Sequence, residues 1–213
     1  MPKSPPPASP RLTEFELHVL QTQHAGHCEL IVNEDHFPRV VREGMGKAAV
    51  SLDIMTADFK AMLIPSPRKG GKAKSVVELF RTLARKGVEI RILHAGTPSG
   101  PALVELKKIC AEAADIHDVP PAKLTIRRCP RLHAKAVVID SRAMYLGSAN
   151  LTGAGLGAKG PHKRNIEMGI WTAAPSLIEG VMEQFNALWE GERCRKCQRK
   201  DVCPVPLEEP QLI

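Results

Sequence analysis

The chain is poor in aromatic residues and has no long hydrophobic run. Phenylalanine, tryptophan and tyrosine together make up 4% of the 213 residues, so the core must be built mainly from aliphatic side chains. No segment approaches the roughly 20 apolar residues that a membrane-spanning helix needs, and no apolar stretch typical of a signal peptide follows the first residues. We therefore expect a cytoplasmic protein without a transmembrane segment.

The rest of the composition is that of a globular protein with an excess of positive charge. Hydrophobic residues make up 43% and charged residues 25% of the chain, which excludes a largely disordered protein. The formal net charge is +7, a balance that favours a polyanionic partner such as nucleic acid or an anionic membrane surface. In a cytoplasmic protein the six cysteines are expected to be thiols or metal ligands rather than disulfides.

Extended and helical patterns alternate along the chain. Apolar, extended segments fall at residues 29–32, 49–55, 62–64, 88–93, 124–127, 133–140, 144–146 and 166–172. Helical patterns fall at residues 37–48, 75–86, 101–114 and 177–189, with Gly87 placed to end the second of them. This alternation predicts an α/β fold in which helices flank a mixed β-sheet. No internal repeat is visible.

Three segments differ in composition. Residues 1–10 carry five prolines and predict a disordered tail. Residues 11–190 predict one folded, catalytic domain, and residues 191–213 form a short cysteine-rich tail. Within the domain, two basic loops are candidate nucleic-acid contacts, although such charge runs are often only solvated loops. Their candidate residues are Arg68, Lys69, Lys72, Lys74, Lys163 and Arg164.

Polar residues interrupt the apolar strand patterns between residues 131 and 169. His133 and Lys135 are two apart on a predicted strand, so both side chains point to one face. The other polar positions of this stretch follow in order: Asp140, Ser148, Asn150 and Glu167. A histidine inside a strand is by itself more often structural than catalytic, but several polar groups in order, each interrupting an apolar strand pattern, are much harder to obtain by chance.

These residues resemble the phospholipase D superfamily. His133, Lys135 and Asp140 have the spacing HxKxxxxD, and the downstream elements Gly-Ser-x-Asn (147–150) and Asn-x-Glu (165–167) match the family in type and order. The resemblance implies a metal-independent phosphodiesterase with that family's α/β sandwich, in which His133 is the nucleophile and forms a phosphohistidine.

The resemblance also assigns roles to the other residues. Lys135 and Asn150 would bind the non-bridging phosphate oxygens, and Glu167 would orient the imidazole. Ser148 would touch the phosphate or the histidine. Asp140 is grouped with the catalytic residues, although it also suits an anchor of the turn.

A second histidine must protonate the leaving oxygen. Larger members of the family resemble two fused copies, each with one HxK motif, whereas this chain has one motif. His94 ends a predicted strand but has no lysine two residues later. We therefore expect a homodimer with the active site at the two-fold interface.

Three functions remain open. A nuclease acting on DNA or RNA is favoured by the positive charge and the basic loops. A phospholipase D or phosphatidyl transferase acting on lipid headgroups would need an amphipathic membrane-facing element, which the sequence does not show clearly. A nucleic-acid-binding subunit of a larger complex is the third alternative, and the complete catalytic set argues against it.

The cysteine-rich tail has the pattern of a metal-binding turn. Cys194, Cys197 and Cys203 follow the spacing Cys-x2-Cys-x5-Cys, which suits zinc or an iron–sulfur cluster and resembles the C-terminal cluster ligands of RecB-like exonucleases. The fourth ligand could be Cys28, Cys110 or Cys129. Cys28 is preferred because it lies beside His24 and His27. The metal would be structural, since the predicted chemistry needs no cofactor.

Overall fold

The computed structural model describes residues 28–66, 70–115, 124–199 and 203. The predicted tail at residues 1–10 lies outside the described residues, as do two of the predicted nucleic-acid contacts, Arg68 and Lys69.

The chain alternates between strands and helices, as the sequence predicted. The strands are β1 (Cys28–Val32), β2 (Ser51–Thr56), β3 (Leu63–Ile64), β4 (Lys74–Ser75), β5 (Glu89–His94), β6 (Leu124–Arg128), β7 (Ala136–Ile139), β8 (Ala143–Gly147) and β9 (Met168–Thr172). The helices are α2 (Val76–Arg85), α3 (Gly100–Asp115) and α4 (Pro175–Trp189), together with a π-helix, η3 (Phe37–Gly44), and the short 3-10 helices η2 (Asn33–Asp35), η4 (Met45–Lys47) and η5 (Pro161–Lys163).

In the described part of the chain, seven strands form one mixed sheet. Their order is β1-β9-β8-β7-β2-β5-β6. Strands β2, β5 and β6 are parallel, whereas β7, β8, β9 and β1 join by antiparallel pairing. The predicted mixed sheet flanked by helices is therefore confirmed.

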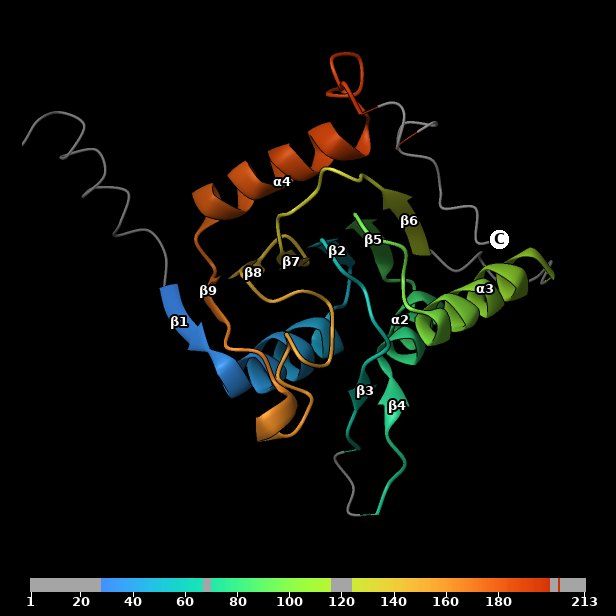
Figure 1. Cartoon of the computed structure of the whole chain (residues 1–213), viewed down its shortest axis with the longest axis vertical. Helices are drawn as coiled ribbons and strands as arrows, with labels where there is room; N and C mark the ends of the chain where they lie inside the picture. The colour runs from blue at the N-terminus through green and yellow to red at the C-terminus, as the bar shows by residue number, and fades with distance from the viewer. Residues whose placement is uncertain (1–27, 67–69, 116–123, 200–202, 204–213) are drawn as a thin grey trace, which may run out of the picture.

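Helices cover both faces of this sheet (Figure 1). On one face, η3, α2 and α3 pack on the larger apolar cluster, which includes Val40, Phe80 and Leu106. On the other face α4 contributes Phe185 and Trp189 to a second cluster. All four residues of β7 are buried, as expected of a central strand covered on both sides. None of the described helices is both long and apolar enough to cross a membrane.

Local sequence explains where α2 begins and ends. The Ser75 hydroxyl accepts a hydrogen bond from the backbone N–H of Glu78 (3.0 Å) and caps the first turn. Gly87 follows the helix with φ of 92°, a left-handed conformation that glycine adopts without steric cost. The helix predicted at residues 75–86 and its glycine stop are confirmed.

Two local features differ from the predictions. The helical pattern at residues 37–48 forms a π-helix followed by a 3-10 turn, rather than a regular α-helix. The strand predicted at residues 133–140 begins at Ala136, so His133 and Lys135 lie on the chain that leads into β7. The two catalytic candidates therefore lie at the N-terminal end of the central strand β7 rather than within it.

Candidate active site

His133 and Lys135 lie together just before β7. The ring of His133 is exposed, whereas Lys135 is only 7% exposed. The Lys135 Nζ is 3.1 Å from Nδ1 and 3.2 Å from Nε2 of His133, and it donates to the His133 carbonyl oxygen at 2.6 Å. An ammonium nearly equidistant from both ring nitrogens cannot point at both lone pairs, so it lies against the ring. The arrangement brings a fixed positive charge to an accessible nucleophile.

The environment of Lys135 weakens its hold on a proton. Burial lowers the pKa of this ammonium, and the nearby Glu167 carboxylate partly offsets the decrease. A partly desolvated ammonium interacts more strongly with an incoming anion than a hydrated one does. The site is therefore suited to binding a phosphate oxygen.

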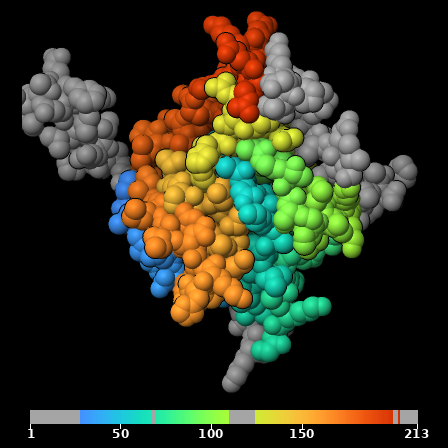
Figure 2. Space-filling model, viewed as in Figure 1, coloured from blue at the N-terminus to red at the C-terminus, as the bar shows by residue number. Residues whose placement is uncertain are grey.

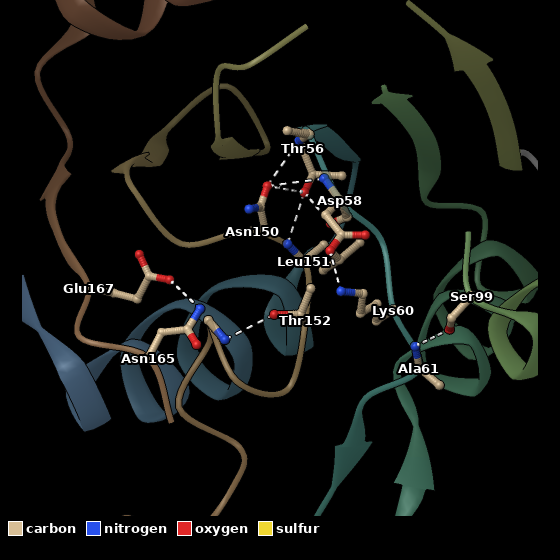
Figure 3. A network of polar contacts seen from close by, with 12 residues as sticks. Thr56, Asp58, Lys60, Ala61, Ser99, Asn150, Leu151, Thr152, Asn165 and Glu167 are labelled. Carbon is tan, nitrogen blue, oxygen red and sulfur yellow. Dashed lines mark hydrogen bonds and ion pairs between the residues drawn. The ribbon is translucent and has the colours of Figure 1, made fainter. Parts of the chain in front are cut away.

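Glu167 is buried beside the start of β9, and its carboxylate has two side-chain donors. The Ser148 hydroxyl donates to Oε2. The Asn165 amide donates to Oε1 at 3.0 Å (Figure 3). The Ser148 hydroxyl oxygen also accepts the backbone N–H of Met168 at 3.1 Å. Ser148 therefore holds Glu167 in place. No hydrogen bond joins Glu167 to His133 in the described structure, so the predicted orienting contact stays a proposal.

Asn150 is fixed by the loop that follows β2. Its Oδ1 accepts the backbone N–H groups of Ala57 (3.0 Å) and Asp58 (3.1 Å) (Figure 3). These two N–H donors identify the atom as the oxygen, which assigns the orientation of the amide; the nearby Thr56 hydroxyl donates its proton to the Asp58 carbonyl at 2.7 Å. The Nδ2 donor consequently faces away from that loop, where it is available to an anionic ligand (Figure 3).

The predicted catalytic residues lie together where strands β7, β8 and β9 begin or end, with one exception. The Gly147 N–H donates to the Lys135 carbonyl at 3.1 Å, and the Ser148 N–H donates to the Met168 carbonyl at 2.9 Å. These bonds align the start of β7, the end of β8 and the start of β9. The loop after β2, which holds Asn150, lies at the same end of these strands.

Asp140 is the exception. It follows β7 at the opposite end, about 16 Å from Lys135 for five extended residues. Its carboxylate accepts backbone N–H groups from Ala49 (3.1 Å), Val50 (2.7 Å) and Ser51 (2.9 Å). Burial alone would raise the pKa of Asp140, but these three bonds outweigh it and the pKa is lowered. Grouping Asp140 with the catalytic residues is therefore corrected: it anchors the turn, the second role that its position suggested.

A buried pair below the site was missed by the sequence analysis. Burial lowers the pKa of His36, so its imidazole is neutral at neutral pH. Its Nδ1 donates to the Asn33 carbonyl (2.9 Å), which leaves Nε2 to accept from the Tyr145 hydroxyl at 3.0 Å. That hydroxyl in turn accepts the Ala149 N–H at 3.0 Å. Burial raises the pKa of Tyr145 to about 12, which keeps the hydroxyl protonated as a donor.

Two glycines make room for this tyrosine. Gly147 and Gly169 are paired across β8 and β9, and a Cβ at either position would collide with Tyr145. The ring therefore lies over the glycine pair and carries its hydroxyl to the turn between Ser148 and Asn150. No simple motif links a tyrosine to a histidine 109 residues away, which is why the pair escaped notice.

The basic loops are only partly available for a ligand. Lys72, Lys74 and Lys163 are exposed. Arg164 is partly buried, and its guanidinium pairs with Glu34 at 3.4 Å. The structure therefore leaves three of the predicted contacts open to solvent and engages a fourth within the protein.

The cysteine side chains that the structure describes fall in two places, and the side chain of Cys110 lies outside the described part. Cys28 lies on β1, where its thiol donates to the Thr172 hydroxyl at 3.2 Å. Because β1 and β6 are opposite edges of the sheet, Cys28 is distant from Cys129, which follows β6. Cys194 and Cys129 both pack against the apolar cluster under α4. The structure therefore does not bring Cys28 to the tail, and brings Cys129 there instead.

Comparisons with known proteins identify the family and the fold. A family model described as "Cardiolipin synthase, PLD-like domain" matches residues 41–189. The 5'-3' exonuclease PLD3 of Rattus norvegicus is 36% identical over 87 residues, which are 41% of this chain and only 16% of that relative's length.

Two solved structures share the fold. Nuc, a phospholipase D family member from Salmonella typhimurium, superposes with a TM-score of 0.53 at 18% identity, covering 78% of this chain and 95% of Nuc. NucT from Helicobacter pylori superposes with a TM-score of 0.53 at 13% identity, covering 78% of this chain and 96% of NucT.

Proposed function

Because the chain belongs to the phospholipase D-like family, whose model matches more than half of it, we propose that it cleaves phosphodiester bonds through a covalent phosphohistidine, without a metal ion. The observation that carries the proposal is the exposed His133 ring with the Lys135 ammonium 3.1 and 3.2 Å from its two nitrogens. A neutral imidazole can attack an anionic phosphodiester, and the ammonium attracts that anion to it.

The reaction proceeds in two displacements. A ring nitrogen of His133 attacks phosphorus, the bond to the leaving oxygen breaks, and that oxygen takes a proton from a general acid. Water then attacks the phosphohistidine and gives a proton to the same group, which now acts as a base, while the bond between phosphorus and the ring nitrogen breaks and releases His133. Each step places negative charge on the non-bridging oxygens.

Two donors are placed to stabilise that charge. Lys135 supplies an ammonium, and Asn150 supplies an amide whose orientation is already fixed by the loop at residues 56–58. Preorganised donors of this kind contribute about 10²- to 10³-fold each to turnover. Glu167, held by Ser148 and Asn165, supplies a buried carboxylate that can accept an imidazole N–H.

The general acid is proposed to be His133 of a second copy of the chain. Of the other histidines that the structure describes, His36 and His94 are fully buried, and each uses its Nδ1 to donate to a backbone carbonyl. His162 is exposed and lies on η5 in the basic loop. Two apolar side chains next to Glu167 in sequence are exposed, Ile166 (91%) and Met168 (62%), and so is Leu30 (68%) on the neighbouring strand β1. We call them the apolar edge patch. Covering this patch with a second copy would complete the site and remove apolar surface from water.

Nucleic acid is the proposed substrate. The chain carries a net charge of +7, and Lys72, Lys74 and Lys163 remain exposed to a polyanion. The relative PLD3 is an exonuclease by name. A lipid phosphodiester is the second candidate, because the matching family model is described as a cardiolipin synthase. The predicted cytoplasmic location suits either substrate.

An oligonucleotide panel tests the chemistry. Single- and double-stranded DNA and RNA are incubated in EDTA with the wild type and with His133→Ala, and anionic liposomes form a parallel arm. We expect cleavage of at least one oligonucleotide by the wild type and none by the variant. Cleavage that requires added magnesium, or that survives His133→Ala, would contradict the mechanism. Hydrolysis of lipid alone would make the second candidate the function.

Subunit association tests the second histidine. Light scattering should give a dimer for the wild type and a monomer for Met168→Glu, with activity lost although His133 is intact. Leu63→Glu is the matched control, since Leu63 is 63% exposed on β3 and should tolerate the charge. An active wild-type monomer would refute the dimeric site.

A further inference from the structure

Cysteines from two distant segments meet at one corner of the molecule. Cys129 follows β6, and Cys194 and Cys197 follow α4. These three line a single cavity of about 250 Å³. Figure 2 shows the segment after α4 (red) lying against the segment after β6 (yellow). Cys129 and Cys194 are 65 positions apart in the sequence, so their meeting is a property of the fold.

The backbone presents these thiols from tight turns. The Cys197 N–H donates to the Cys194 carbonyl at 3.1 Å, and the Cys203 N–H donates to the Arg199 carbonyl at 3.0 Å. On the other segment, Cys129 donates its N–H to the His94 carbonyl at 2.8 Å at the end of the sheet. A Cys-x2-Cys turn facing a thiol on a rigid edge is the usual frame of a structural metal site.

We propose that Cys129, Cys194, Cys197 and Cys203 bind a thiophilic metal, as a zinc ion or an iron–sulfur cluster. In the described residues no three ligand side chains are already arranged as a metal site, so the thiols must turn into the cavity when the metal binds. The inference replaces Cys28 with Cys129 as the fourth ligand and does not depend on the proposed activity.

The proposed metal site lies next to the proposed nucleophile. Cys129 lies four residues before His133, and His133 lines the same cavity. Between them, Arg131 donates to the Cys197 thiol at 3.8 Å. A metal bound here would fasten the tail to the loop that presents the nucleophile.

Metal content of the purified full-length protein tests the site. Elemental analysis after anaerobic purification should find about one zinc per chain, or iron with sulfide, and either metal supports the four-cysteine site. Cys129→Ser should lower the metal content at least severalfold. Cys28→Ser is the matched control and should leave the content unchanged. Metal-free wild-type protein, or full loading of Cys129→Ser, would overturn the proposal.

A second measurement covers a variant that fails to fold. Thiols of the wild type are counted with a maleimide before and after a strong chelator. Four additional thiols should react once the metal is removed, and the melting temperature should fall by roughly 5 °C or more, because a metal that binds only the folded state stabilises it. An unchanged number of reactive thiols after chelation would also contradict the proposed metal site.

Discussion

The two ends of strand β7 carry parts of one sequence motif but do different work. Just before its start lie His133, whose ring is exposed, and Lys135, whose ammonium group lies against that ring. At its end, Asp140 turns back into the protein and gathers three backbone N–H groups. Residues of one sequence motif therefore need not lie in one site, because strand β7 places Asp140 at the opposite end of the sheet from His133 and Lys135.

The largest effect is expected at the open end of β7. His133→Ala removes the proposed nucleophile, so turnover should fall at least 10³-fold, while the melting temperature stays close to that of the wild type because the ring is exposed. Single-turnover assays and thermal denaturation measure the two quantities. If His133→Ala lost much of its stability but kept turnover, His133 would have the structural role that we assign to Asp140.

Lys135 tests the same end with a smaller effect. Lys135→Met keeps the length of the side chain and removes its charge, so turnover should fall about 10²-fold through lost stabilisation of the phosphate oxygens. Because burial lowers the pKa of Lys135, wild-type activity should also decline at a lower pH than an ordinary lysine would give. A pH–rate profile of the wild type checks the predicted decline. An unchanged kcat in Lys135→Met would contradict the proposed role of the Lys135 charge.

Asp140 should show the opposite pattern. Asp140→Asn weakens the bonds to residues 49–51 and should cost about 2 kcal/mol of unfolding free energy, with turnover within a few-fold of the wild type. Because the folded-state pKa of Asp140 is lowered, its contribution is complete above the carboxyl's ordinary pKa and disappears as the pH falls through the folded value.

Urea denaturation at several pH values measures this effect. The stability difference between the wild type and Asp140→Asn should be largest near neutral pH and should shrink in acid. A loss of turnover as large as that of Lys135→Met would return Asp140 to the catalytic set.

Local patterns carried most of the fold and the chemistry. The helix of residues 75–86 could be predicted because its cap, its apolar spacing and its glycine stop are all local. His133, Lys135 and Glu167 could be grouped in one predicted site because their spacing resembles the motifs of the phospholipase D superfamily. These signals depend on neighbours within a few residues.

The remaining features depend on which strands become neighbours. Cys28 was preferred over Cys129 because it had histidines beside it in sequence, but the strand order places it at the far edge. His36 and Tyr145 meet only because β1 leads directly into η2 and η3 below β8. Strand order comes from long-range packing, which a single sequence does not display.

The glycine pair under Tyr145 makes the evolution of three positions interdependent. Gly169→Ala alone places a methyl group inside the space of the tyrosine ring, so selection should reject it in this background. The same change becomes acceptable once position 145 carries a smaller side chain, at the cost of the hydroxyl that reaches His36. In a randomised library, survivors should therefore couple these positions, a case of epistasis created by one aromatic ring.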